Sequence, residues 1–149
     1  MAQPRYETQQ DRDNEAAMIQ RAFSRINPVA TKLPPQYAVD WLLEYVKDDQ
    51  KRRAWVECKQ RSFKMAGFTT YMMSLHKYMK GMQLASWSGY PFILLVQWTD
   101  ALGMILLNEH DPMPIEIGGR TDRGDPLDVE PVVMIPTHKF KVVAHTTPG

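Results

Sequence analysis

The chain has 149 residues, of which 44% are apolar and 23% are charged, and its formal net charge is +1. This length is that of one ordinary globular domain and excludes a second domain of similar size. Its one cysteine, Cys58, excludes an internal disulfide and a cysteine-rich zinc site, and the near-zero net charge excludes a nucleic-acid binder that works through bulk charge alone.

The two ends of the chain differ in character from its middle. Residues 1–10 are polar and predict a flexible N-terminus, residues 11–140 predict a single domain, and residues 141–149 predict a tail. The N-terminal residues lack the apolar run of a signal peptide, and the longest apolar run, residues 91–96, is far shorter than the roughly 20 residues that span a bilayer. With a reduced cysteine, these features predict a cytoplasmic protein without a membrane partner.

The first third of the chain predicts a helix followed by two strands. Apolar residues recur at helical spacing over residues 11–26 and alternate with period two over residues 37–46. The polar run 47–50 predicts a turn, and a second strand follows over residues 51–59. These two strands are expected to form an antiparallel hairpin.

The rest of the chain continues the mixed pattern. Residues 69–87 predict a second helix, the continuous apolar run 91–96 predicts a strand buried on both faces, and residues 101–107 predict its hairpin neighbour. The proline- and glycine-rich residues 108–130 predict a long loop, and residues 131–135 a last strand. The fold class is therefore α/β, an α+β arrangement with a mixed sheet and a core ordered helix-strand-strand-helix-strand-strand.

The register of the first hairpin brings two carboxylates together. If the turn occupies four residues, counting back along the antiparallel ladder places Glu44 opposite Arg53 and Asp40 opposite Glu57. The first of these pairs joins opposite charges across the strands, which supports the register. Lys59 lies two residues beyond Glu57 and therefore on the same face of the sheet.

Two neighbouring carboxylates repel each other, so either a cation binds between them or one acid stays protonated at neutral pH. Apolar residues flank both Asp40 and Glu57, which puts the acids at the edge of a buried sheet and favours the cation. Carboxylate oxygens suit Mg²⁺, with Mn²⁺ as a substitute, and a nearby Lys59 can orient or deprotonate a water that attacks a phosphodiester. The alternative is an ion-paired Asp, Glu and Lys on an exposed sheet face.

A hydrophobically flanked Asp40, a spacer and then Trp55-Val56-Glu57-Cys58-Lys59 before a helix resembles the PD-(D/E)XK nuclease superfamily, especially its small phage-type and Holliday-junction-resolvase-like members. The match in order covers residues 11–107. One departure is Val39, which stands where the family name places a proline.

The resemblance implies a restriction-endonuclease-like core and a larger metal site. In that family an acid on the first helix joins the aspartate and the E-x-K motif, which here implies Glu15 as a further catalytic residue and the backbone carbonyl of Cys58 as a further metal ligand. A polar residue on the following helix often faces the site. Among the candidates on that helix, we favour Gln83 over His76, Lys77 and Lys80.

Basic residues gather around the proposed site. Residues 47–64 hold seven basic residues against three acidic ones, a local charge of +4, whereas the rest of the chain carries −3. This distribution suits a phosphate backbone, although a solvated hairpin tip has the same signature. The expected DNA contacts are Arg53, Arg61, Lys64, Lys77, Lys80, Gln83, Arg120 and Arg123.

Two of these expected DNA contacts, Arg120 and Arg123, come from the glycine-rich segment 118–125. Its glycines allow close backbone approach, and Arg120 and Arg123 are placed to clamp phosphates or to stabilise a dimer. An ordinary surface loop is the third interpretation. Neither a P-loop nor a Rossmann glycine motif is present, so we expect no organic cofactor.

These observations predict a Mg²⁺-dependent deoxyribonuclease, and they favour an endonuclease over an exonuclease. We expect it to be encoded by a phage and to act in the host cytoplasm on DNA in recombination, repair or replication. A branched substrate with two symmetric strands would call for a homodimer. The alternatives are a non-catalytic DNA-binding or assembly protein that retains the nuclease-like fold, and a purely structural phage subunit. A dependence of DNA binding on the divalent ion distinguishes the enzyme from the binding protein.

Overall fold

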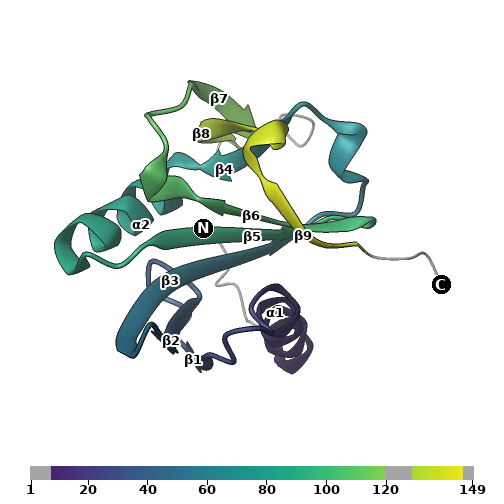
Figure 1. The fold of residues 1–149 in the computed structure, drawn as a ribbon. Coiled ribbons are helices and arrows are strands. Elements are labelled where there is room, and N and C mark those ends of the chain that lie inside the picture. Colours follow the sequence, from purple (N-terminus) through teal and green to yellow (C-terminus); the bar gives the residue numbers. More distant parts are fainter. Residues whose placement is uncertain (1–7, 120–128, 146–149) are drawn as a thin grey trace.

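The structure is a computed structural model that describes residues 8–119 and 129–145 (Figure 1). The described helices are α1 (Gln9–Ala22) and α2 (Leu75–Ser88). The strands of the larger, mixed sheet are, in spatial order, β1 (Val29–Lys32), β2 (Trp41–Lys47), β3 (Gln50–Gln60), β5 (Phe92–Gln97), β6 (Ala101–Leu106) and β9 (Lys141–His145). The strands of the smaller, antiparallel sheet are β4 (Thr70–Ser74), β8 (Val129–Pro136) and β7 (Ile115–Gly119).

The first helix begins at a reciprocal hydrogen-bonded cap. The Thr8 hydroxyl accepts a hydrogen bond from the Asp11 amide at 3.0 Å, and the Asp11 carboxylate accepts one from the Thr8 amide at 3.1 Å. Such a capping box satisfies two of the amides that a helix start leaves unpaired. The predicted helix over residues 11–26 is therefore confirmed in kind, although it begins two residues earlier and ends at Ala22.

The β2–β3 hairpin has the predicted register with a shorter turn. Lys47 pairs with Gln50, so only Asp48 and Asp49 form the turn, and both adopt a positive φ of 53° and 61°. Two left-handed residues match the twist of a hairpin, and Asp tolerates this conformation. The expected four-residue turn is wrong, but the ladder is unchanged because the extra pair adds one residue to each strand. Glu44 lies opposite Arg53 as predicted.

Two segments predicted as parts of longer elements have a different structure. Residues 37–40, expected in the first hairpin strand, form a bent segment before β2 begins at Trp41. Residues 70–74, expected in the second helix, form β4, because Tyr71 and Met73 are buried while Met72 between them is exposed. This alternation has the period of a strand, and the helix starts only at Leu75.

Three strands were not predicted at all. β1 lies in the segment between the first helix and the hairpin, β7 lies within the expected loop 108–130, and β9 occupies residues expected in the C-terminal tail. Each lies at the edge of a sheet. Edge strands bury fewer side chains, so their sequences carry a weaker apolar pattern.

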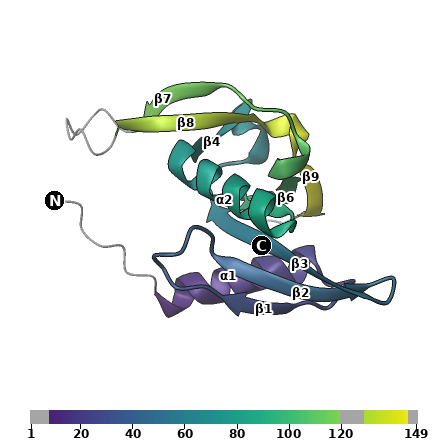
Figure 2. The same cartoon turned by 90° about the vertical axis from the view of Figure 1, so that its left-hand side faces the viewer.

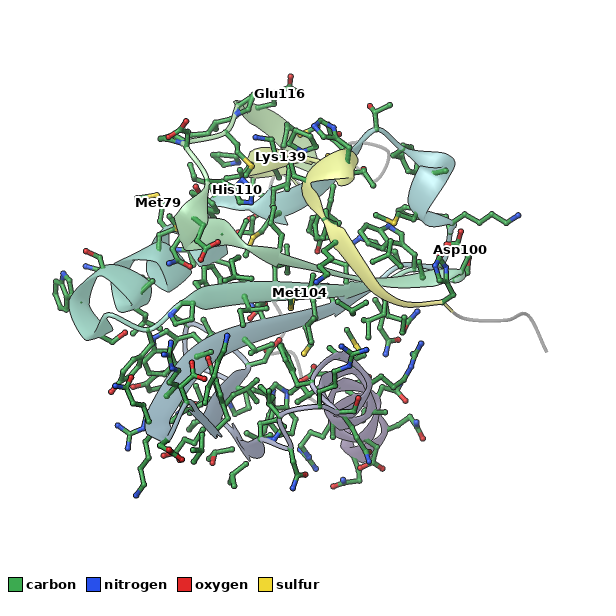
Figure 3. The ribbon with its side chains drawn as sticks, in the orientation of Figure 1. Met79, Asp100, Met104, His110, Glu116 and Lys139 are labelled. Atoms are coloured by element: carbon green, nitrogen blue, oxygen red, sulfur yellow. The ribbon has the colours of Figure 1, made fainter. Side chains whose placement is uncertain are left out.

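The fold buries one core on each face of the larger sheet. β3 and β5 are parallel, and the chain between them contains α2, which packs on one face, while α1 packs on the other (Figures 1 and 2). The first five residues of β5 are all buried, which confirms the predicted central strand. Met104 of β6 points toward α1, and Asp100 at the β5–β6 turn accepts a hydrogen bond from the Met65 amide at 3.0 Å (Figure 3).

Neither α1 nor α2, the helices of the described chain, has the length and apolar character needed to cross a membrane.

Close packing between α2 and β5 generates the first prediction. A Cβ atom added at Gly81 would lie 2.1 Å from Cε2 of Phe92, whose side chain is fully buried. Gly81→Ala is expected to lower the free energy of unfolding by about 1–3 kcal/mol despite alanine's better helix propensity, because the ring must shift in a packed core. Urea denaturation measures this. Ser86→Ala, at an exposed position of the same helix, is the control, and an equal effect of the two substitutions would contradict the packing argument.

Candidate active site

Three acidic side chains and three lysines meet where the β2–β3 hairpin ends. The acids are Glu15 of α1, Asp40 just before β2, and Glu57 of β3, and the lysines are Lys32 of β1, Lys59 of β3 and Lys77 of α2. They meet because β1 ends, β2 begins and β3 approaches its end at the same edge of the sheet. All four proposed catalytic residues belong to this group.

Asp40 is held by the backbone of β3. The ladder of paired residues stops at Trp41 and Val56, so Asp40 lies one step beyond it. Its Oδ2 accepts a hydrogen bond from the Cys58 amide at 2.9 Å, and its Oδ1 lies 3.6 Å from Lys32 Nζ. The predicted register thus continues as a side-chain contact that keeps Asp40 beside Glu57 and Cys58.

Glu57 is a buried carboxylate with a partly satisfied set of hydrogen bonds. Its side chain is 0% exposed, and Oε2 lies 3.2 Å from Lys77 Nζ and 3.6 Å from Lys59 Nζ. Oε1 has no hydrogen-bond partner among the described residues. Burial and the negative charge of Asp40 raise the pKa of Glu57 to about 7, although Lys59 and Lys77 oppose the rise. The carboxyl group therefore exchanges its proton near neutral pH.

Glu15 is held on the α1 side of the sheet. Its Oε1 accepts hydrogen bonds from Trp41 Nε1 at 2.8 Å and from Lys32 Nζ at 3.1 Å. Burial and the charge of Asp40 raise the pKa of Glu15 above its usual range, because both disfavour the ionised form. Because Lys32 Nζ also lies 3.6 Å from Asp40 Oδ1, this ammonium group bridges the carboxylates of Glu15 and Asp40.

The alternation of side chains along β3 divides the site between the two faces of the sheet. Glu57 packs against Lys77 of α2, whereas Cys58 belongs to the core beside α1. Burial raises the pKa of the Cys58 thiol, because the ionised form is disfavoured in this core. Asp40 contacts Cys58 and Lys32, and its charge raises the pKa of Glu57, so it couples the two faces.

A cleft of about 390 Å³ opens on this group of residues. Glu15, Asp40, Lys32, Lys59 and Lys77 are among its lining residues. Glu57 has no exposed surface of its own but contacts two of the lining lysines. The cleft thus gives a ligand access to a site of mixed charge next to a buried acid.

The residues present fit a divalent cation held by few protein ligands. Within residues 8–119 and 129–145, no three Asp, Glu, His or Cys side chains gather closely enough to form a ready-made cage. Mg²⁺ is usually held by one or two carboxylates and keeps several waters, so such a cage is not needed. The unpartnered, buried Oε1 of Glu57 beside the carboxylate of Asp40 is the observation that fits, because a buried acceptor without a donor is costly.

Sequence reasoning did not find Lys32, and on α2 it favoured a residue that the structure places at a neighbouring hollow and not against Glu57. Lys77, not Gln83, contacts Glu57, whereas Gln83 is exposed and lines a second hollow together with Lys80. Lys32 was not predicted because its short strand carries no clear periodic pattern. Its basic charge alone did not distinguish it from other lysines.

The remaining predicted DNA contacts have different surroundings. Arg53 pairs with Glu44 at 3.1 Å and donates to the Tyr90 hydroxyl at 3.1 Å. Arg61 lies 4.6 Å from the centre of the Tyr71 ring and donates to its hydroxyl at 2.9 Å. Lys64 precedes the short helical turn 65–67, and Arg120 and Arg123 lie outside the described residues.

Residues 1–143 match the family described as "Phage putative PDDEXK endonuclease". The chain belongs to this family. The predicted PD-(D/E)XK resemblance is thereby confirmed, and it covers almost the whole chain instead of residues 11–107 alone.

A solved structure shares the fold of this PD-(D/E)XK protein. Hjc of Archaeoglobus fulgidus, a Holliday junction resolvase from an archaeal hyperthermophile, matches with a TM-score of 0.52 and 12% sequence identity. The match covers 89% of this chain and 96% of Hjc. The mixed-sheet, nuclease-like fold class is therefore confirmed. No curated protein matches this chain by sequence.

The raised pKa of Glu57 predicts a pH dependence of stability in metal-free buffer. Between the ordinary pKa of 4.5 and the folded value of about 7, the folded state keeps a proton that the unfolded state has released. The contribution of Glu57 to stability therefore falls as pH rises through this interval and levels off above it. Glu57→Gln stays neutral, so relative to wild type it should gain stability between about pH 4 and about pH 8.

Urea denaturation of both proteins in the presence of a chelator measures this gain. Glu44→Gln is the matched control, because Glu44 is also paired with a basic residue but lies on an exposed part of the hairpin. A stability difference between Glu57→Gln and wild type that does not change with pH would contradict the shift.

Proposed function

We propose that this protein is a Mg²⁺-dependent DNA endonuclease of a phage, acting in DNA recombination, repair or replication, and that Mn²⁺ can replace Mg²⁺. The observation that carries the proposal is the buried Glu57, with one unpartnered oxygen, beside Asp40 and Lys59. Family membership supports a nuclease, and the fold shared with a resolvase supports branched DNA as its substrate.

The chain's own residues have distinct roles in this proposal. Asp40 and Glu57 would hold the metal together with the backbone carbonyl of Cys58. When bound, Mg²⁺ supplies a Lewis acid that stabilises the negative charge developing on the phosphate oxygens. Lys59, whose ammonium group lies 3.6 Å from Glu57, orients the attacking water and lowers the cost of its deprotonation.

Glu15 acts through its neighbours. It holds the Trp41 indole and the Lys32 ammonium group, and Lys32 in turn lies 3.6 Å from Asp40. We infer that this chain of contacts fixes the Asp40 carboxylate in place. Glu15 is therefore a positioning residue in the proposed reaction, which refines its expected catalytic role.

The basic segment 47–64 supports DNA as the substrate. Its local charge of +4 includes Lys59 at the cleft, together with Arg53, Arg61 and Lys64. Cationic side chains near the cleft bind the phosphate backbone without reading sequence. For a branched substrate with two symmetric strands we propose a homodimer, in which each copy cuts one strand.

A non-catalytic DNA-binding or assembly protein is the second candidate. One observation favours it: each of the two carboxylates that would hold the metal has a lysine ammonium within 3.6 Å. Such lysines neutralise the acids without a metal. The two candidates differ in whether a divalent ion binds and whether DNA is cut.

Cleavage assays on linear, flapped and four-way DNA test the proposed function. Asp40→Asn and Lys59→Ala should each reduce Mg²⁺-dependent cleavage by at least about a hundredfold, because they remove a metal ligand and the group that orients the water. Glu44→Gln serves as the control, since Glu44 lies on the same hairpin outside the cleft. Cleavage that survives both substitutions, or no cleavage of any substrate, would overturn the proposal.

Calorimetric titration with Mn²⁺ separates the two candidates without a reaction. Wild-type protein should bind the ion, and Asp40→Asn should weaken binding by about tenfold or more because it replaces a charged oxygen ligand. Glu44→Gln should bind as the wild type does. Failure of the wild-type protein to bind Mn²⁺ would favour the non-catalytic protein.

A further inference from the structure

A second hollow adjoins the active-site cleft. It has a volume of about 500 Å³ and lies between the segment 35–38 and α2. Pro35 and Lys77 line both the hollow and the cleft, so the two spaces adjoin each other at these residues. Its size falls in the range of about 300–1,000 Å³ that is typical of small-ligand pockets. A ligand in the hollow would therefore lie next to a strand in the cleft.

The side chains that line the hollow combine an aromatic ring with cationic and polar groups. Tyr37 is 49% exposed, and its ring stands at the segment before β2. From the helix, His76, Lys80 and Gln83 line the opposite wall, and all three are exposed. The hollow therefore offers a stacking surface opposite groups that bind phosphate.

The helical wall continues past the hollow to a second aromatic ring. His76, Lys80, Gln83 and Trp87 follow each other at intervals of four, three and four residues, which places them on one face of α2. Trp87 is 82% exposed, whereas tryptophan is highly buried on average. From His76 to Trp87 the helix rises about 16 Å, so the face is long enough to contact more than one nucleotide.

An exposed aromatic ring across from a basic and polar helix face, and a second exposed aromatic at the far end of that face, form the pattern of a surface that binds single strands. Bases of an unpaired strand stack on aromatic side chains while cations follow its backbone. In a duplex the bases are stacked on each other and paired, so Tyr37 and Trp87 would find no base face to contact. The surface thus favours unpaired over duplex DNA.

We propose that Tyr37 and the α2 face formed by His76, Lys80, Gln83 and Trp87 bind an unpaired DNA strand that adjoins the strand in the active-site cleft. This assignment rests on the proposed function for the identity of the nucleic acid. It narrows the substrate class to DNA with a single-stranded arm next to the cut, such as a flap or an open junction.

Tryptophan fluorescence of the metal-free, full-length protein tests this assignment without catalysis. A short oligothymidine should quench the emission of the exposed Trp87, and a blunt duplex of equal length should not. In Trp87→Phe the quenching should disappear while affinity stays within about threefold, because phenylalanine still stacks on a base. Trp41 and Trp98 are buried, and Trp55 is partly buried with its indole donating to Ser88, so the signal that remains in Trp87→Phe reports these three tryptophans.

Fluorescence anisotropy of labelled DNA measures the energetic contribution of each ring. Trp87→Ala and Tyr37→Ala should each weaken single-strand binding by about tenfold and change duplex binding by less than about twofold. Ile117→Ala is the matched control, since it removes an exposed apolar side chain from β7 of the smaller sheet. Circular dichroism melting establishes that each variant folds.

Two results would overturn the assignment: no quenching by the oligothymidine, or equal losses of single-strand and duplex binding in Trp87→Ala and Tyr37→Ala. These results are independent of the proposed function. Duplex cleavage without single-strand binding would leave the nuclease in place and remove the strand-binding surface. Ring-dependent single-strand binding without cleavage of any DNA would keep the surface and remove the nuclease.

Discussion

The burial of the Glu57 carboxylate is the constraint on which the site depends. A fully buried acid with an unpartnered oxygen lowers the stability of the ionised folded state, and the pKa of Glu57 is raised to about 7 as a result. Lys59 and Lys77 offset only part of this cost. A protein selected for stability alone would replace the acid with an apolar side chain, so the retained carboxylate is best explained by a function that needs it.

The hairpin places this acid, and its geometry follows from local rules. Asp48 and Asp49, which both have a positive φ, close the turn between β2 and β3. Because the strands pair residue by residue from this turn, the start of β2 lies beside the last part of β3. Beyond the last backbone pair, the Asp40 carboxylate replaces a backbone carbonyl and accepts a hydrogen bond from the Cys58 amide. The site therefore lies where the backbone pairing of β2 and β3 ends and side chains line the cleft instead.

Sequence periodicity predicted the elements that are buried and missed those that are not. The central strand β5 and the hairpin were found because their apolar patterns are long and regular. The edge strands β1, β7 and β9 were missed, and β4 was absorbed into the following helix because methionines suit both structures. Missing β1 also meant missing Lys32, whose ammonium group joins Glu15 to Asp40.

The sequence by itself determined that Asp40 and Glu57 meet, because Glu57 and Lys59 lie on one hairpin, Asp40 directly precedes it, and the register of the hairpin depends only on neighbouring residues. The tertiary structure alone decided which residues surround them. Lys77 reaches Glu57 because the crossover between the parallel strands β3 and β5 lays α2 on that face, and the same packing sets the helix opposite Tyr37. These contacts join segments far apart in the chain, and their positions follow from burying two cores at once, which no local pattern records.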